Sequence, residues 1–442
     1  MKNITLGLWL LLAALTGLWL LSDNLWPQPF GYFPFRTAFM QLSGIIAIGA
    51  MSVAILLALR PKWLEPTLGG LDKMYRLHKW LGITALVASV LHWWFGQGSQ
   101  WMVGWGWLIR PPRGPAPELT NPIEQFLRGQ RGLAESLGEW AFYAAVILLA
   151  LALIKRFPYH LFFKTHRLLA IVYLIFVYHS VVLMKFAYWS AGVGWILALL
   201  MAGGAVAAVM ALLRRIGANR QISGVIETLI HYPELQVLES AIRLNEGWPG
   251  HQAGQFAFVT SRPSEGAHPY TIASAWNNDG RIVFITKALG DHTRALPERL
   301  KVGDAVKVEG PYGCFNFQSS QPRQIWIGAG IGITPFIARL KHLAQSTEPQ
   351  EIDLFHPTAD YAEAAIAKLK ADAQAANVRL HLRLTHQDGR LDAAQVRAIV
   401  PEWQSASIWF CGPSAFGQAL RQDFIMHGLA AHDFHQELFE MR

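Results

Sequence analysis

Six apolar segments, each near the length needed to cross a lipid bilayer, occupy the first half of this 442-residue chain. They cover residues 4–21, 38–59, 77–95, 136–154, 161–184 and 188–213. A helix of roughly 20 apolar residues crosses a hydrocarbon core of ~30 Å, so the segments predict a six-helix transmembrane bundle. The first segment follows Lys2 as a signal peptide would, but residues 22–29 offer no small-residue cleavage site, which favours a retained helix.

The two halves of the chain differ in charge. Residues 1–216 carry 18 basic and 7 acidic side chains, a net charge of +11, whereas residues 217–442 carry 20 basic and 23 acidic ones, a net charge of −3. Basic residues beside apolar segments indicate membrane topology rather than nucleic-acid binding, for which no recognition motif is present. With only two cysteines, the chain is not a disulfide-stapled secreted domain.

The basic residues near the helix ends predict an orientation. Thirteen of them lie in one set of connections, including Arg60 and Arg214, and six lie in the opposite set, including Arg110. By the positive-inside bias, both termini and the whole second half are cytoplasmic. The Trp-, Gly- and Pro-rich connection over residues 96–135 is then extracytoplasmic, in a bacterial-type inner or plasma membrane.

Four histidines inside the apolar segments carry the strongest chemical signal. His78 and His92 lie 14 residues apart on the third segment, and His166 and His179 lie 13 apart on the fifth. At ~1.5 Å per residue, each helix offers one histidine near each membrane face, about 20 Å apart. Singly, each could be an interfacial anchor or a satisfied polar residue, but the matched heights favour two six-coordinate haems. Since 13 residues turn an ideal helix by about 220°, the fifth helix is expected to be distorted, or His166 to lie in an irregular first turn.

The second half changes to short β-like runs and then to strands alternating with helices. Runs over residues 222–230, 235–243, 255–260, 281–287 and 305–309 predict a small antiparallel barrel. From Gln324 the rhythm of strand, glycine turn and helix predicts a parallel α/β sheet. The expected domains are therefore residues 1–216, 217–320 and 321–442.

A first motif in the barrel consists of His268, Pro269, Tyr270, Thr271, Ile272, Ala273 and Ser274. An aromatic ring and alternate hydroxyls on an extended segment can hold the isoalloxazine of a flavin. Alone the motif is weak evidence, because Tyr and Thr are common in strands. Nineteen residues after His268, a basic residue, a glycine turn and a helix cap suit a pyrophosphate: Lys287, Gly290 and Thr293.

A second motif follows a hydrophobic strand and opens a helix. It contains Gly328, Gly330, Gly332, Thr334 and Pro335. Backbone amides and the helix N-terminus there can face a dinucleotide phosphate. The motif is not the strict GxGxxG fingerprint, and it could be a structural turn.

A third motif, Cys411, Gly412 and Pro413, also follows a strand. It is expected at the C-terminal edge of the sheet, where ligands bind in open α/β folds. Cys411 taken alone could equally be a buried, inert thiol.

In this order, the motifs resemble the ferric reductase and NADPH oxidase superfamily over nearly the whole chain. The resemblance implies a membrane flavocytochrome b with a six-helix haem domain, a ferredoxin-reductase-type FAD barrel and an NAD(P)-binding domain. It implies that the four histidines bind two b haems, with the family's own spacings of 14 and 13, and that the three motifs bind FAD and NADPH or NADH. Catalytic roles then fall to Tyr270, Cys411 and Phe439, the last as the aromatic with which relatives shield the flavin.

Three departures from the family stand out. Oxidases place a second histidine four residues after the outer haem ligand, where this chain has Gly96. No EF-hand calcium loop precedes the helices. Residues 355–360 contain no Arg or Lys for a nicotinamide 2′-phosphate, so NADH and NADPH both stay open.

These features lead to the hypothesis that the protein transfers electrons across the membrane, from NAD(P)H through FAD and two haems to a ferric chelate or oxygen outside. Arg36 could attract an anionic chelate or pair with a haem propionate, although an interfacial helix-end charge is the simpler interpretation. Expected partners are the lipid bilayer and a small-molecule acceptor. Two alternatives stay open: an electron-delivery subunit that docks an extracytoplasmic enzyme through residues 97–135, and a non-redox membrane protein with a nucleotide-binding tail.

Overall fold

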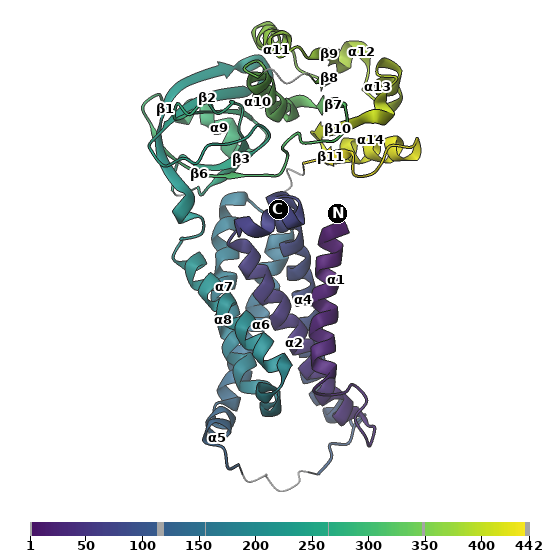
Figure 1. Ribbon diagram of the computed structural model, residues 1–442. Helices are drawn as coiled ribbons and strands as arrows, with labels where there is room; N and C mark the ends of the chain where they lie inside the picture. Colours follow the sequence, from purple (N-terminus) through teal and green to yellow (C-terminus); the bar gives the residue numbers. More distant parts are fainter. Residues whose placement is uncertain (1, 113–118, 155, 264, 347–349, 438–442) are drawn as a thin grey trace. The chain divides into compact units, whose positions relative to one another are not determined.

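The computed structural model describes residues 2–112, 119–154, 156–263, 265–346 and 350–437. The chain divides into two compact units, one formed mainly by residues 1–216 and the other mainly by residues 217–441. The first is helical and the second is built on two sheets (Figure 1).

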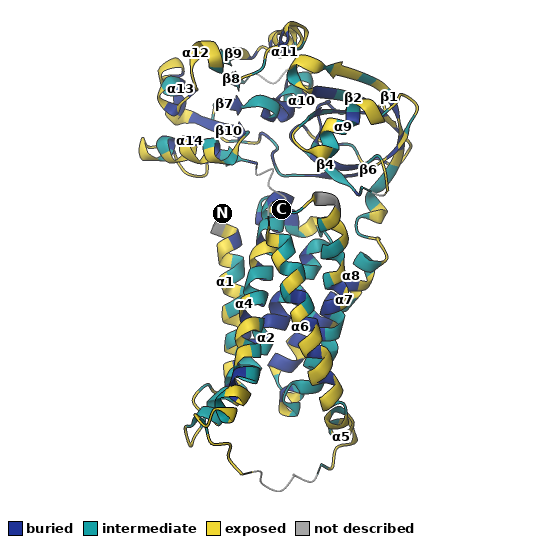
Figure 2. Ribbon diagram, turned by 180° about the vertical axis from the view of Figure 1, so that it is seen from behind, coloured by how far each residue is buried: buried dark blue, intermediate teal, exposed yellow. Residues whose placement is uncertain are grey.

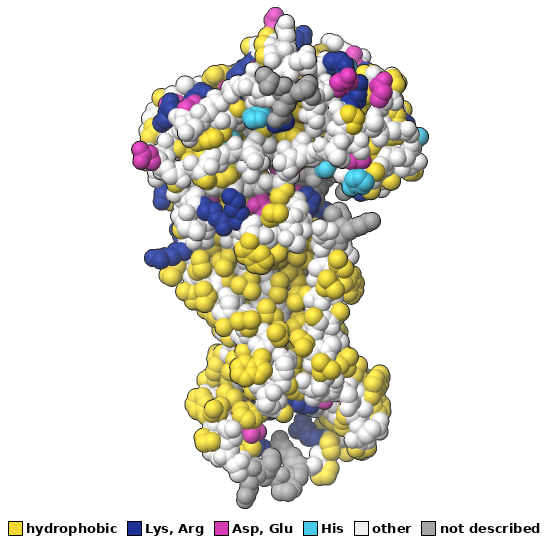
Figure 3. Space-filling model, viewed as in Figure 1, with side chains coloured by type: hydrophobic (Ala, Val, Ile, Leu, Met, Phe, Trp, Pro, Cys, Tyr) yellow, Lys and Arg dark blue, Asp and Glu magenta, His cyan; other side chains and the backbone are white. Residues whose placement is uncertain are grey.

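The first unit is a bundle of long helices. These are α1 (Lys2–Leu20), α2 (Tyr32–Ala58), α4 (Leu71–Gly104), α6 (Arg131–Leu153), α7 (Tyr159–Leu183) and α8 (Gly192–Leu212), joined by the short α3 (Glu65–Leu68) and α5 (Pro122–Gly129) and the 3₁₀ turns η1 (Lys62–Leu64) and η2 (Phe186–Ser190). Figure 2 shows buried segments within the bundle. Trp19, Ile48 and Leu197 belong to its hydrophobic core. The face drawn in Figure 3 carries many hydrophobic side chains, and exposed residues of the bundle include Trp9, Trp140 and Trp195, as expected where lipid rather than water surrounds the helices.

Five of the long helices are apolar enough to cross a membrane by length and composition: α1, α2, α6, α7 and α8. They cover most of five of the six predicted segments, although the segment predicted over residues 188–213 begins in η2, before α8. The remaining segment lies inside α4, which is 34 residues long but carries Lys73, Arg76 and Lys79 in its first turns. Composition among the described residues thus supports five spans, and a sixth stays a prediction.

The first sheet of the second unit is the predicted antiparallel one. Its strands are β1 (Gln221–Tyr232), β2 (Val237–Leu244), β3 (Phe256–Thr260), β4 (His268–Thr271), β5 (Arg281–Lys287) and β6 (Ala305–Tyr312), in the order β4-β3-β6-β1-β2-β5. A bridge between Ile272, just after β4, and Phe284 on β5 joins the two edge strands. The sheet therefore curls round a core that includes Ile226, Ala257 and Val308, and helix α9 (Asp291–Arg299) follows β5.

The second sheet is parallel, as predicted. Its strands are β7 (Arg323–Gly328), β8 (Glu351–Thr358), β9 (Arg379–Leu384), β10 (Ala406–Cys411) and β11 (Phe434–Gln436), in the order β11-β10-β7-β8-β9. One face packs on α10 (Thr334–Leu343) and α11 (Glu363–Ala375), and the other on α13 (Ala393–Ile399) and α14 (Ser414–Met426); the short α12 (Thr385–Asp388) follows β9. The chain order reverses between β7 and β10, which creates the crevice where open α/β sheets bind ligands.

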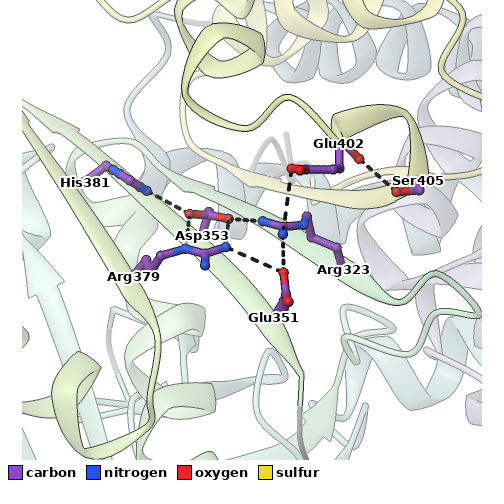
Figure 4. A network of polar contacts seen from close by, with 7 residues as sticks. All are labelled: Arg323, Glu351, Asp353, Arg379, His381, Glu402 and Ser405. Atoms are coloured by element: carbon purple, nitrogen blue, oxygen red, sulfur yellow. Dashed lines mark hydrogen bonds and ion pairs between the residues drawn. The ribbon is translucent and has the colours of Figure 1, made fainter.

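The buried carboxylate of Asp353 lies near the amino ends of the strands, at the other end of the sheet from the crevice (Figure 4). Asp353 accepts hydrogen bonds from Arg323 at 2.9 Å, from two Arg379 nitrogens at 2.8 Å and from His381 at 2.9 Å. Burial raises the pKa of Asp353, but the hydrogen bonds from Arg379 and His381 outweigh it and hold that pKa far below its usual range. The network joins the amino ends of β7, β8 and β9, and so it stabilises the sheet away from the ligand edge.

Candidate functional site

The four predicted ligand histidines form two pairs inside the helical bundle. The ring centroids of His78 and His166 lie 5.9 Å apart, and those of His92 and His179 lie 6.2 Å apart. Helix α7 is continuous from Tyr159 to Leu183, so the distortion expected from the 13-residue spacing is not found. His166 lies in the second turn of this helix, and both α7 histidines still face their α4 partners.

Hydrogen bonds at Nδ1 fix the ring orientation and the tautomer of three of these imidazoles. The acceptors are backbone carbonyls: Ala54 for His78 at 2.8 Å, Met40 for His92 at 3.0 Å, and Ala134 for His179 at 2.8 Å. Because a carbonyl oxygen only accepts, Nδ1 carries the proton and Nε2 keeps its lone pair. Metal-binding histidines are commonly held by such contacts.

His166 is held differently. Its Nδ1 is buried and has no hydrogen-bond partner among the described residues. Its ring stacks on Phe162, with centroids 5.0 Å apart and planes 25° apart. Packing rather than a hydrogen bond therefore orients this imidazole.

The spacing of both pairs fits a metal ion between the rings. A metal–imidazole bond is about 2 Å long and the ring centre lies roughly 1 Å beyond the nitrogen, so two coaxial ligands place their centroids about 6 Å apart. A cavity of about 600 Å³ lined by His92 and His179 also reaches Met51 and Met201. That volume lies within the ~300–1,000 Å³ of small-molecule and cofactor pockets. The residues present thus fit a haem at this pair.

Arg36 lines the same cavity and is tied to α4. Its Nε donates to the Phe95 carbonyl at 2.7 Å and to the Ser99 hydroxyl at 3.0 Å, and its Nη2 donates to the Gly96 carbonyl at 3.3 Å. The guanidinium is therefore fixed by hydrogen bonds beside the cavity.

Gly138 on α6 makes room for His179, and we expect Gly138→Ala to disturb this pair. A Cβ at position 138 would lie 2.1 Å from His179 Nδ1, so the ring must leave the Ala134 carbonyl. Disturbing an outer-shell partner of a metal ligand costs about 10–100-fold in affinity, which haem titration of the purified protein measures. Gly132→Ala on the same helix is the control, since nothing lies within 4 Å of its Cβ. Equal haem affinities in the two variants would contradict this role of Gly138.

Residues 268–274, the predicted flavin segment, occupy the seam at which the barrel closes. Residues 268–271 form β4 and pair with β3, and the Ala273 N–H donates to the Val283 carbonyl at 2.8 Å. The side chains from Thr271 to Ser274 are buried, and Tyr270 is half-buried beside Phe284, with ring centroids 6.2 Å apart. The segment is thus extended and held on both sides.

His251, which no sequence pattern identified, anchors the end of this segment. The Trp248 Nε1–H donates to His251 Nδ1 at 3.4 Å, so Nε2 carries the proton and donates to the Ser274 carbonyl at 3.1 Å. Burial lowers the pKa of His251 to about 4, which keeps the ring neutral above that pH. The Ser274 hydroxyl accepts from the Val283 N–H at 3.1 Å and so serves the barrel itself.

The predicted turn after β5 opens a helix as expected. Gly290 is the N-cap of α9, and Thr293 Oγ1 accepts from the N–H groups of Leu289 and Gly290 at 3.0 and 3.1 Å. Lys287 Nζ, predicted to face a pyrophosphate, lies 2.5 Å from Asp360 Oδ2. The lysine therefore links the barrel to the end of β8.

His268 stacks on His292 beside Glu265. The two ring centroids lie 3.6 Å apart with planes 7° apart, and His292 Nδ1 lies 2.5 Å from Glu265 Oε2. Burial and then the charge of His292 lower the pKa of His268 to about 4. A ligand nitrogen binds a metal in the plane of its ring, so two parallel rings do not converge on one ion. We therefore assign no metal to this cluster.

The glycine turn lies at the end of β7, as predicted. Strand β7 ends at Gly328, the 3₁₀ turn Gly330–Ile333 follows, and α10 begins with Thr334 and Pro335. His356 on β8 donates from Nδ1 to the Gly328 carbonyl at 2.7 Å. The turn is thus fixed by the neighbouring strand and leads directly into a helix N-terminus.

The third motif meets this turn at the sheet crevice. The Ala329 N–H donates to the Cys411 carbonyl at 2.9 Å, and a Cβ on Gly332 would lie 2.2 Å from the same oxygen. Gly412 has φ +155° and Pro413 precedes α14. The Cys411 thiol is buried, and burial and then the charge of Glu437 raise its pKa. Phe439, the predicted flavin shield, lies outside the described residues.

Two family models match the chain. Residues 43–177 match the family described as ferric reductase like transmembrane component, and residues 227–316 match the FAD-binding domain. The first match includes His78, His92 and His166, and the second includes the flavin segment. The resemblance to the ferric reductase and NADPH oxidase superfamily is confirmed at the level of these two domains: a membrane domain is followed by a flavin domain.

Curated relatives match part of the chain. An NADPH oxidoreductase of Mycobacterium tuberculosis is 30% identical over 200 residues, and a flavohemoprotein of Bordetella pertussis is 29% identical over 216 residues. Each match covers 43% of this chain and 52% of the relative, so the chain spans about half the length of these relatives. Among solved structures, the Amycolatopsis cytochrome P450 reductase GcoB has a TM-score of 0.45 at 20% identity, over 50% of this chain and 70% of that one.

Proposed function

We propose that this chain, which joins a ferric-reductase-like membrane domain to an FAD-binding domain, passes electrons from cytoplasmic NAD(P)H to an extracytoplasmic acceptor. FAD and two bis-histidine b haems are the proposed carriers, and a ferric chelate or oxygen is the proposed acceptor. The observation that carries the proposal is the presence of two pairs of facing imidazoles on the same two helices. Their ring centroids lie 5.9 Å apart in one pair and 6.2 Å apart in the other. The names of the relatives, an NADPH oxidoreductase and a flavohemoprotein, support the choice of carriers.

The protein would bind each electron carrier and keep the NAD(P)H site apart from the site of the acceptor. When bound, NAD(P)H supplies a hydride, and FAD and haem pass its electrons on singly. The turn at Gly330 and the start of α10 present backbone N–H groups to a pyrophosphate. Residues 268–274 would hold the flavin at the barrel seam. His78, His92 and His179 present unprotonated Nε2 atoms, and His166 faces His78 from α7. The facing histidines would hold each haem from two sides, and a haem held in this way would supply one-electron transfer to an acceptor that does not bind the iron.

Arg36 is the proposed positive group at the outer end of the path. It lines the cavity of His92 and His179 and is fixed by three hydrogen bonds. A cation held there favours an anionic group in the cavity, a haem propionate in the first place.

Spectroscopy of the purified full-length protein tests the proposal. We expect a bis-histidine b-haem spectrum that NADH or NADPH reduces without oxygen, and that a ferric chelate or oxygen then reoxidises. Ferrous iron and superoxide-dismutase-sensitive signal, measured side by side, distinguish the two acceptors. A preparation that contains flavin but no bis-histidine haem would contradict the electron path.

A second candidate is electron delivery to an extracytoplasmic enzyme. The connection from α4 to α6 exposes large apolar side chains, with Trp107 72% and Ile109 90% accessible. Such side chains can form a docking surface. Co-purification of a partner after cross-linking, lost when both residues are changed to serine, is the result expected for this candidate.

A further inference from the structure

A small cavity lies beside the glycine turn, at the carboxyl end of β8. Its volume is about 110 Å³, and its lining includes Gly330 on the turn, and His356, Thr358 and Asp360 at the end of β8. In sheets of this kind a dinucleotide lies over the glycine turn, and its adenosine ribose reaches the end of the neighbouring strand. This cavity therefore lies where the adenosine end of a nicotinamide coenzyme is expected.

Asp360 is the charged residue of the segment that ends β8. The segment 356–362 contains no arginine or lysine, and the Asp360 side chain is 40% exposed. An acidic side chain at this place accepts hydrogen bonds from the ribose 2′-hydroxyl of NADH, whereas a 2′-phosphate requires a cation. Arg383 on β9 does not line this cavity, and its guanidinium donates to the Asp388 carbonyl at 2.9 Å.

Three lysines line the cavity, and each already has a partner. Lys341 donates to the Ala273 carbonyl at 3.4 Å, and Lys368 pairs with Glu239 at 2.8 Å. Lys287 is paired as well. Its Nζ lies 2.5 Å from Asp360 Oδ2, and both residues line the cavity. A 2′-phosphate must therefore compete with Asp360 for this lysine and meet the carboxylate's negative charge. A ribose hydroxyl meets neither obstacle.

We propose that Asp360 makes this chain select NADH over NADPH, an inference that rests on the proposed use of a nicotinamide coenzyme. Asp360 acts in two ways: its carboxylate accepts from the ribose hydroxyl, and it occupies the ammonium group of Lys287. Like charges brought together at a binding site cost enough to give about tenfold or greater discrimination. The ion pair with Asp360 also explains why Lys287, although it is a cation in this cavity, does not favour NADPH.

Calorimetric titration of the full-length protein with NAD⁺ and with NADP⁺ tests this inference without turnover. We expect the wild type to bind NAD⁺ at least about tenfold more tightly than NADP⁺. Asp360→Ala frees Lys287, so its affinity for NADP⁺ should rise about tenfold while its affinity for NAD⁺ falls. The double variant Asp360→Ala/Lys287→Met should lose the gain in NADP⁺ affinity.

Glu227→Gln is the matched control. Glu227 on β1 pairs with Arg243 on β2 at 2.7 Å, and neither residue lines this cavity. The control should leave the ratio of the two affinities unchanged. Tighter binding of NADP⁺ by the wild type, an unchanged ratio in Asp360→Ala, or an equal change in Glu227→Gln would overturn the inference. Binding of neither coenzyme would instead count against the proposed function.

Discussion

Replacing His92 by alanine is expected to remove the haem proposed between His92 and His179 and to stop reduction of the acceptor. Without one of two axial nitrogens, the site keeps only the ligand from α7. The haem content per protein, measured as the pyridine haemochrome, should fall by about half, since the pair His78 and His166 is untouched. Reduction of the flavin by NAD(P)H without oxygen should persist, because the flavin segment lies in the other unit.

Ser43→Ala is the control for this variant. The Ser43 hydroxyl lies 3.3 Å from His92 Nδ1, but the Met40 carbonyl at 3.0 Å remains as acceptor. The control should therefore keep both haems and the acceptor activity. An unchanged haem content in His92→Ala would exclude His92 as a haem ligand. An equal loss of haem in Ser43→Ala would show that any substitution near this site lowers the haem content, whether or not it removes a ligand.

The histidine pairs could be predicted from the sequence because helix rise converts a spacing into a height. The companion argument from helix rotation, which expected a distorted fifth helix or an irregular first turn at His166, was wrong. In the structure α7 is an unbroken helix from Tyr159 to Leu183, and both of its histidines still reach α4. The carbonyl partners of the imidazoles, such as Ala54, could not be predicted, because the backbone offers an acceptor at every residue and only packing selects one.

The sheets of the second unit were predictable from strand periodicity, but the contacts between them were not. Lys287 on β5 pairs with Asp360, 73 residues later and after a strand of the other sheet. The sequence motif predicted that Lys287 faces a pyrophosphate. Its pairing with Asp360 could not be foreseen, because it depends on how the two sheets pack. His251 gave no signal either: it lies in a loop, and its role follows from Trp248 and Ser274 on either side.

Gly332→Ala is expected to weaken the binding of both nicotinamide coenzymes while leaving flavin and haem contents unchanged. A Cβ there would lie 2.2 Å from the Cys411 carbonyl oxygen and 2.6 Å from its carbon. These are backbone atoms that cannot swing aside, so the glycine turn and the Cys411 loop must separate. Such overpacking costs about 1–3 kcal/mol. Because a bound coenzyme needs the closed crevice, binding must supply this energy, which corresponds to about 5–150-fold in the dissociation constants of NAD⁺ and NADP⁺.

The pattern of this loss distinguishes Gly332 from Asp360. A change in the crevice shared by both coenzymes should weaken NAD⁺ and NADP⁺ by the same factor, whereas a change at Asp360 should alter their ratio. Ala364→Ser, which adds one atom on the exposed first turn of α11, is the control for an added side-chain atom in the same sheet domain. If Gly332→Ala bound both coenzymes as the wild type does, the crevice between the glycine turn and Cys411 would not be their binding site, because no coenzyme could lie there unaffected by the separation of its two walls.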